Sequence, residues 1–175
     1  MQVNEAIASR LSIRKYTEVN IPPDHMALLL KALQLAPSSA NSQNREFIFV
    51  DDPKIKRELV WACYNQSFVQ KCNYFIAGVA DPVKKYYQVD VTIALTNFTL
   101  QATELGYGTC WIGAFDEVYI NELLRVPENK KVVVCMTFGR PLKNSLPRKR
   151  KPFEEFVFMN SHGQPWINDH SLKNV

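Results

Sequence analysis

The stretch Lys131-Val132-Val133-Val134-Cys135-Met136-Thr137-Phe138 is a run of β-branched and apolar residues. Apolar side chains on both faces are typical of a strand that is covered on both sides of its sheet, so we expect a central strand here. Gly139-Arg140-Pro141 follows, and this glycine and proline are expected to end the strand. Further apolar runs predict strands at residues 47–50, 74–79, 109–113 and 153–158.

Helical signals alternate with these strands. Capping residues and apolar periodicity predict helices at residues 3–9, 22–36, 53–64, 66–71, 86–105 and 117–125. The segment from Met26 to Ala36 is apolar on most faces, so we expect this helix to be buried. The helix at 86–105 is apolar nearly all round, which indicates burial on more than one side, and in a small chain the second side can be another subunit. The pattern favours an α+β fold with a mixed sheet flanked by helices.

Length and composition fit a single globular domain, because the chain has 175 residues, of which 46% are hydrophobic and 22% charged. We expect one domain over residues 1–175, with a polar C-terminal tail from about residue 159. No internal repeat or linker divides the sequence. No G-x-G-x-x-G follows the first strand, so the sequence lacks the dinucleotide fingerprint of a Rossmann domain.

The sequence gives no sign of a membrane or a metal. No uniformly apolar segment could span a bilayer, and the start of the chain lacks the pattern of a secretory signal, so we expect a cytoplasmic protein. The four cysteines form no C-x-x-C pair, so we expect free thiols and no metal site; they are Cys63, Cys72, Cys110 and Cys135. The three histidines lie far from the motifs below, which argues against histidine acid–base chemistry.

The positive charge is local. The net charge is +4, and residues 140–151 hold six basic residues and no acid. The rest of the chain then has 15 basic and 17 acidic residues, a net −2. This distribution indicates an anion site or a basic tail and argues against a nucleic-acid-binding face.

Four stretches carry groups suited to binding a ligand. Arg10, Ser12 and Arg14 bring two guanidinium groups and a hydroxyl within reach of one small anion. Pro37–Asn44 is an uncharged loop of short hydrogen-bonding side chains. Gly106–Phe115 is rich in glycine beside aromatic residues, and residues 148–151 are all basic. A planar heterocycle that carries a phosphate would use all four.

With these motifs in this order, the sequence resembles the nitroreductase family of FMN-dependent oxidoreductases. The matching features are R-x-S-x-R-x-Y at 10–16, P-S-S-x-N-S-Q at 37–43, G-x-G-T-C-W-I-G-x-F at 106–115 and the C-terminal G-R-P…P-R-K-R-K-P. The resemblance implies an α+β fold and an intertwined homodimer with FMN at the subunit interface. It also implies that the late strand near Phe156 adds to the partner's sheet.

The activity implied by the resemblance is the transfer of a hydride from NADH or NADPH through FMN to a small acceptor. The acceptor would be a nitroaromatic, a quinone or a similar molecule, reduced by a ping-pong mechanism. FMN carries this chemistry, so the resemblance assigns no catalytic side chain.

The resemblance also implies roles for individual residues. Arg10, Ser12 and Arg14 would hold the ribityl phosphate, with Leu11 between them, and Arg148 and Arg150 would close on the same phosphate. The pyrimidine edge of the ring or the ribityl chain would meet a second group, formed by Pro37, Ser38, Ser39, Asn41 and Gln43. The backbone amides of Gly113 and Ala114 would face the ring near its N5 and O4 atoms. Ile112 would also belong to the cofactor site, and Asn65 would contact the ring.

Three positions depart from the family's common pattern. Leu11 stands where a second basic residue is frequent, Asn44 where proline is frequent, and Arg45 where an aromatic residue is common. These departures affect the expected substrate side more than the flavin side. The chain is also short for the family, which predicts an open pocket.

Other functions stay open at this point. A non-enzymatic protein that stores or senses FMN would bind the flavin without oxidising NAD(P)H. Another branch of the superfamily would carry out reductive dehalogenation or chemistry on the flavin itself. A basic nucleic-acid-binding domain ranks last, because the aromatic-studded sheet motif of RNA-recognition domains is missing.

Overall fold

A five-stranded sheet organises the larger part of the molecule and is built around β5 (Lys131–Pro141). β3 (Tyr74–Ala80) pairs antiparallel with one side of β5, and β2 (Glu46–Val50) pairs antiparallel with β3. β4 (Gly108–Ile112) and the two-residue β1 (Tyr16–Thr17) also pair antiparallel with β5. The strand order therefore runs from β2 through β3 and β5 to β4.

This computed structural model describes residues 1–142 and 148–166. The chain divides into two compact units, residues 1–145 and 146–175, which are treated separately below. Within the described ranges, the strand ladders are antiparallel, and parallel pairing is limited to a single bridge between Ser12 and Thr109. The predicted α+β fold is confirmed.

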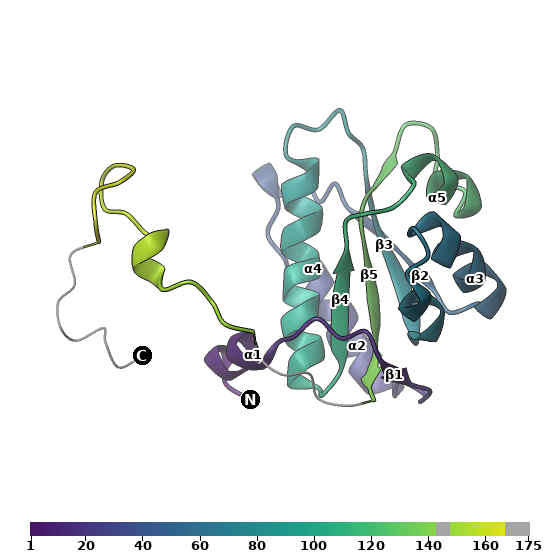
Figure 1. Cartoon of the computed structure of the whole chain (residues 1–175). Coiled ribbons are helices and arrows are strands. Elements are labelled where there is room, and N and C mark those ends of the chain that lie inside the picture. Colours follow the sequence, from purple (N-terminus) through teal and green to yellow (C-terminus); the bar gives the residue numbers. More distant parts are fainter. Residues whose placement is uncertain (143–147, 167–175) are drawn as a thin grey trace. The chain divides into compact units, whose positions relative to one another are not determined.

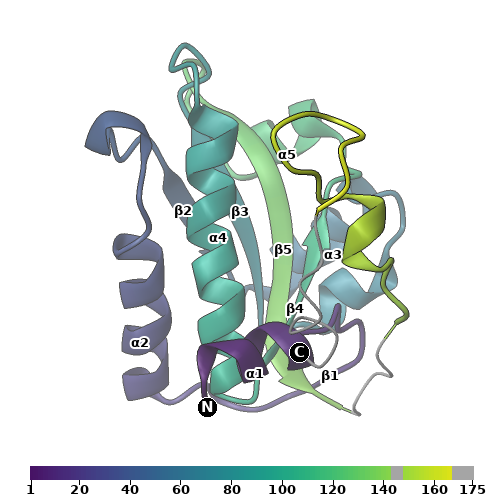
Figure 2. The ribbon, with the colours of Figure 1, turned by 90° about the vertical axis from the view of Figure 1, so that its left-hand side faces the viewer.

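Helices cover both faces of the sheet (Figure 1). α2 (Pro23–Gln34) and α4 (Tyr87–Glu104) lie side by side on one face, with α1 (Val3–Ser9) against α4 (Figure 2). α3 (Pro53–Ala62), the 3₁₀ helix η2 (Ser67–Lys71) and α5 (Glu117–Leu123) lie on the other face.

Side chains of β3 alternate between the two faces, as a strand requires. Phe75, Ala77 and Val79 enter the core beneath α3 and α5, whereas Ile76 and Ala80 enter the core beneath α2 and α4. The structure is thus a sheet between two helical layers, with a separate apolar core on each side. This arrangement matches the predicted strands at 47–50, 74–79, 109–113 and 131–138 and the predicted helices.

The prediction that Gly139-Arg140-Pro141 ends the central strand was wrong. β5 continues to Pro141, which is paired with Tyr16. Gly139 makes this continuation feasible, because a Cβ there would overlap the side chain of Asn73. The Asn73 Oδ1 atom accepts a hydrogen bond from the Arg140 amide at 3.1 Å, and Pro141 is tolerated at the end of the strand.

The prediction that the helix at 26–36 is buried was also wrong for one of its sides. Leu29 and Leu33 are buried against α4, but Leu28 and Leu35 are 47% and 68% exposed. The reason is that α2 packs against α4 and β2, and its remaining side is left uncovered. α4 similarly buries one side and leaves Val89 51% exposed.

The smaller unit corrects a third prediction. Residues 153–158 do not form a strand in this chain, because Phe153–Glu155 is the 3₁₀ helix η3 and Phe158 makes a single bridge to Pro165. A strand requires a neighbouring strand to satisfy its backbone, and within the described residues of this unit there is none.

No helix among the described residues is long and apolar enough to cross a membrane. The four cysteines are free, as predicted, and all four are buried. No cluster of three or more metal-ligating side chains occurs in the described ranges.

Candidate cofactor site

The arginine-bearing segment lies directly beside β4. Ser12 forms the parallel bridge with Thr109, and the Ile13 amide donates to the Thr109 carbonyl oxygen at 2.9 Å. Gly108 permits this approach, since a Cβ at that position would overlap the Ile13 side chain. Two motifs that are about a hundred residues apart in sequence, R-x-S-x-R-x-Y and G-x-G-T-C-W-I-G-x-F, therefore form one surface.

Tyr16 holds the turn that connects it to Ile13. Its hydroxyl donates to the Ile13 carbonyl oxygen at 2.6 Å and lies 2.7 Å from the Thr137 hydroxyl on β5. Burial raises the pKa of Tyr16 far above its usual value, so the phenol stays protonated and keeps its donor. Sequence reasoning counted Tyr16 as part of the motif but did not foresee this anchoring role.

Arg10 and Arg14 are the cations of this surface. Arg10 is half-buried and Arg14 is exposed, with its guanidinium carbon 5.8 Å from the centre of the Phe68 ring. No ion pair among the described residues involves either arginine. Both charges act on Cys110 of β4, yet burial dominates and raises the pKa of that thiol. Two guanidinium groups without a carboxylate partner in the described chain are suited to bind an anion.

The end of β4 is an exposed segment on the strand that the arginine segment contacts. Ile112 is buried, but Gly113 and Ala114 are exposed, and no atom lies within 4 Å of a Cβ added at Gly113. The Gln66 amide Nε2 donates to the Ala114 carbonyl at 3.4 Å, which ties this segment to the turn after α3. Asn65 belongs to the same turn, and its contact with the ring stays a prediction.

The turn after α3 has an unusual backbone. Tyr64 and Asn65 have φ angles of 51° and 63°, in the left-handed region that non-glycine residues seldom adopt. Such conformations persist only when the surroundings hold them, and they concentrate at functional sites. Here the Asn65 amide donates to the Val60 carbonyl at 2.9 Å, which completes the end of α3.

The Ser/Asn/Gln loop forms a second group, centred on the 3₁₀ turn η1 (Ser39–Asn41). It leads into β2, whereas the arginine segment lies on β4. Three strand spacings separate β2 from β4, which is roughly 14 Å at about 4.8 Å each. The fold of one chain therefore does not bring this loop to the arginines. Its predicted site residues are Pro37, Ser38, Ser39, Asn41 and Gln43.

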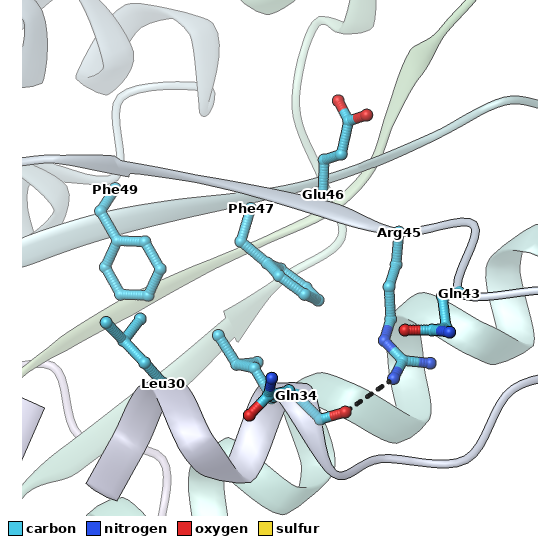
Figure 3. Close-up of a pocket in the computed structure, with 8 residues that line it drawn as sticks. Leu30, Gln34, Gln43, Arg45, Glu46, Phe47 and Phe49 are labelled. Atoms are coloured by element: carbon cyan, nitrogen blue, oxygen red, sulfur yellow. Dashed lines mark hydrogen bonds between the residues drawn. The ribbon is translucent and has the colours of Figure 1, made fainter. Parts of the chain in front are cut away.

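A pocket of about 490 Å³ adjoins this loop, between α2 and β2 (Figure 3). Phe47 and Phe49 point from β2 toward Leu30 of α2, and Gln43 and Arg45 lie at one end. The Arg45 guanidinium donates to the carbonyl oxygens of Gln34, Ala36 and Pro37. Arg45 thus caps the end of α2, which explains why this chain departs from the family's aromatic residue.

The structure also shows what the other two departing residues, Asn44 and Leu11, contact. The Asn44 side chain donates to the Asp81 carbonyl at 3.0 Å and accepts from the Asp81 amide at 3.2 Å. Asn44 and Arg45 therefore anchor the loop and are not free for a substrate. Leu11, which lies between the two arginines in the sequence, packs against the core beneath α3 and α5.

Arg148 and Arg150 lie exposed in the smaller unit. Their position relative to Arg10 is not determined, so a shared phosphate contact stays a prediction. Residues 143–147, and His170 in the last stretch of the chain, lie outside the described residues.

His25 corrects the expectation that the histidines lie apart from the motifs. Its Nδ1 atom is 2.8 Å from the hydroxyl of Tyr107, a residue of the glycine-rich stretch. Tyr107 is buried in the core on the α2 and α4 face, and the Arg140 guanidinium carbon lies 5.3 Å from the centre of its ring. This contact holds the turn between α4 and β4 and involves none of the predicted ligand residues.

Sequence reasoning missed Asp90. This carboxylate is buried in the first turn of α4 and accepts hydrogen bonds from two residues of the Ser/Asn/Gln loop. A signal was present, because Asp90 is the sole acid in the otherwise uncharged segment from Tyr86 to Thr103.

The comparison with known proteins fits the geometry. A family model described as "Putative TM nitroreductase" matches residues 2–170. The chain belongs to the nitroreductase family. Among solved nitroreductase relatives, a nitroreductase family protein from Clostridium novyi NT shares 30% identity, with a TM-score of 0.78 over 95% of this chain and 97% of that one.

Two further relatives have names that describe their chemistry. The NADPH:FMN oxidoreductase from Vibrio harveyi, whose structure is a complex with NAD⁺, is 27% identical, with a TM-score of 0.86 over 93% of this chain and 78% of that one. The FMN reductase (NADPH) of Bacillus subtilis is 25% identical, and the match covers 90% of this chain and 73% of that protein. The predicted membership of the nitroreductase family is confirmed.

Proposed function

We propose that this protein is an FMN-dependent oxidoreductase that takes a hydride from NADH or NADPH and reduces a small acceptor such as a nitroaromatic or a quinone. Membership of the nitroreductase family and the names of its relatives support FMN as cofactor and NAD(P)H as donor. The observation that carries the proposal is the Ser12–Thr109 bridge, because it joins the cationic segment to β4, the strand that leads to the exposed Gly113.

The described residues fit a flat ring that carries a phosphate. Arg10 and Arg14 supply two guanidinium groups with no ion-pair partner among the described residues, and Ser12 is exposed between them. Charge-assisted hydrogen bonds to phosphate are worth about 1.5–3 kcal/mol each. The space above Gly113 admits a ring that approaches the backbone, which a larger side chain would block.

FMN, when bound, supplies the hydride chemistry by taking up two electrons from NAD(P)H and giving them to the acceptor. The side chains bind and orient the cofactor and need not transfer a proton. The exposure of Gly113 and Ala114 leaves room for the donor and the acceptor to occupy one place in turn, as a ping-pong mechanism requires.

A homodimer would complete the site. The Ser/Asn/Gln loop and the arginine segment lie on opposite edges of the sheet, so we propose that each FMN is bound by the arginine segment of one chain and the loop of its partner. The exposed apolar residues Leu28, Leu35 and Val89 of α2 and α4 would be buried in such a dimer. Arg148 and Arg150 would add to the phosphate contacts, so that residues 1–175 work as one FMN-binding domain.

The four free, buried cysteines favour a reducing compartment, and we propose the cytoplasm.

The test is a visible absorption spectrum of the purified protein, recorded before and after anaerobic addition of NADH or NADPH. A flavin spectrum that bleaches supports the oxidoreductase and leads to a screen of acceptors. A flavin spectrum that neither nucleotide changes would point to storage or sensing of FMN. A colourless protein that also fails to bind added FMN would refute the proposal.

A further inference from the structure

The Ser/Asn/Gln loop divides its polar groups into two sets. One set is used within the fold: the Ser38 hydroxyl accepts from the Gln43 amide at 2.9 Å, and the Asn41 and Ser42 amides bond back to Ser38 and Ser39. The other set comprises the side chains of Asn41 and Gln43, which are exposed and make no hydrogen bond to a described residue. Figure 3 shows the Gln43 side chain at the rim of the pocket between α2 and β2. The loop thus presents two amide groups to a ligand.

This presentation depends on a strained backbone. Ala40, Asn41 and Gln43 have φ angles of 48°, 53° and 51°. The left-handed region is unfavourable for an ordinary residue, although asparagine tolerates it better. Three such residues within four positions will not persist without external bonds that select this conformation.

Two residues fix the end of the loop through such bonds. Asn44 pairs with the backbone of Asp81, and Arg45 caps α2 through the Pro37, Ala36 and Gln34 carbonyls. Neither reaches the residues between Ser38 and Gln43, so a different group must hold the middle of the loop.

Asp90 holds the middle of the loop. One carboxylate oxygen accepts from the Ser39 amide at 2.9 Å, and the other accepts from the Ser42 hydroxyl at 3.1 Å. Asp90 is only 2% exposed and forms no ion pair with a described residue. A buried carboxylate is expensive unless hydrogen bonds compensate it, and its place in the first turn of α4 adds the favourable helix dipole.

We propose that Asp90 is a positioning residue for the cofactor, which selects the loop conformation that aims the Asn41 and Gln43 side chains at the flavin ring. The inference deepens the proposed function and rests on it. It concerns a residue on α4 that acts through Ser39 and Ser42.

The test compares D90A, D90N and S42A with the matched control D24N, which removes an exposed first-turn acid from α2. Each apoprotein is titrated with FMN, the dissociation constant is taken from flavin fluorescence, and the visible spectrum of the bound flavin is recorded. D90A should weaken FMN binding by about tenfold or more and shift the flavin band, because the ring loses fixed amide partners. S42A should weaken binding less and in the same direction, since one of the two bonds remains.

D90N provides the conservative rescue. Its Oδ1 can still accept from the Ser39 amide and its Nδ2 can donate to the Ser42 oxygen, so we expect binding within about threefold of the wild type. D24N should bind FMN like the wild type. The loss of an acid from the first turn of a helix would then not by itself explain a weaker affinity in D90A.

Wild-type affinity and an unshifted flavin band in both D90A and S42A would overturn the inference while leaving the proposed function intact. If D90A fails to fold, S42A decides, because Ser42 is exposed and its loss leaves Asp90 in place. A wild-type chain that binds no FMN would refute the proposed function, and the inference would fall with it.

Discussion

The amide of Ile13 donates to the carbonyl of Thr109 at 2.9 Å, which joins the arginine segment to the glycine-rich strand. This bond places the charges of Arg10 and Arg14 close enough to act on Cys110 of β4, the strand that leads to Gly113. The proposed cofactor site depends on this pairing.

Removing either guanidinium should weaken FMN binding. R10A and R14A should each lose about 1.5–3 kcal/mol of binding free energy, or roughly ten- to a hundredfold in dissociation constant. The control is K15A, which removes the exposed cation next to Arg14 in the sequence without removing a guanidinium. FMN titrations at two salt concentrations measure the effect. Equal losses in all three variants would mean that only net charge matters.

Gly108 and Gly113 should respond differently to the same substitution. G108A forces a Cβ into the Ile13 side chain, so it should lower the free energy of unfolding by about 1–3 kcal/mol. G113A meets open space, so its stability should match the wild type while its affinity for FMN falls. Denaturant unfolding and FMN titration measure the two quantities. The pairing of the two segments would be in doubt if G108A were as stable as the wild type.

The hydroxyl of Tyr16 should add to the free energy of unfolding beyond what the packing of its ring contributes. Y16F leaves the Ile13 carbonyl and the Thr137 hydroxyl without a shared partner, which should cost about 1–3 kcal/mol. Y119F is the control, because the exposed Tyr119 hydroxyl bonds Glu58 at the surface and its loss should be nearly neutral. Urea unfolding of both variants makes the comparison, and similar losses would contradict an anchoring role for Tyr16.

The buried thiols predict a loss of stability at alkaline pH. Burial raises the pKa of Cys63 and Cys72 to about 12 from an ordinary value of 9.0. Their folded-state pKa values exceed the unfolded ones, so their contribution is fully present below pH 9.0 and is lost as pH rises toward 12. Unfolding midpoints measured from pH 7 to 11 should therefore fall above about pH 9, and Ellman's reagent should label the thiols only after denaturation. Rapid labelling of the native protein at pH 8 would contradict this burial.

Much of the fold could be predicted from local signals. The run at 131–138 is apolar on both faces because β5 is covered by helices on both sides, and Pro53 and Gly106 mark helix ends through backbone constraints that act locally. The continuation of β5 to Pro141 could not be foreseen. It depends on Asn73 and Tyr16, which are brought there by tertiary structure.

The sequence predicts which residues form the candidate site, but not how these residues are arranged in space. The motifs named the arginine segment, the loop and the end of β4, but sequence cannot show that the loop lies three strands away from the arginines. The structural roles of Asp90, Asn44 and Arg45 were missed because each bonds to backbone groups, which residue types do not identify.

The most direct test of the central claim is complementation between two defective chains. One chain carries R10A and R14A, and the other carries N41A and Q43A; FMN binding is measured for each alone and after the two are unfolded and refolded together. If each site combines the arginines of one chain with the loop of its partner, a mixed dimer regains one intact site, about a quarter of all sites in a random mixture. If mixing restores no binding beyond the sum of the separate chains, the two groups do not meet across a dimer interface, and the proposed site is wrong.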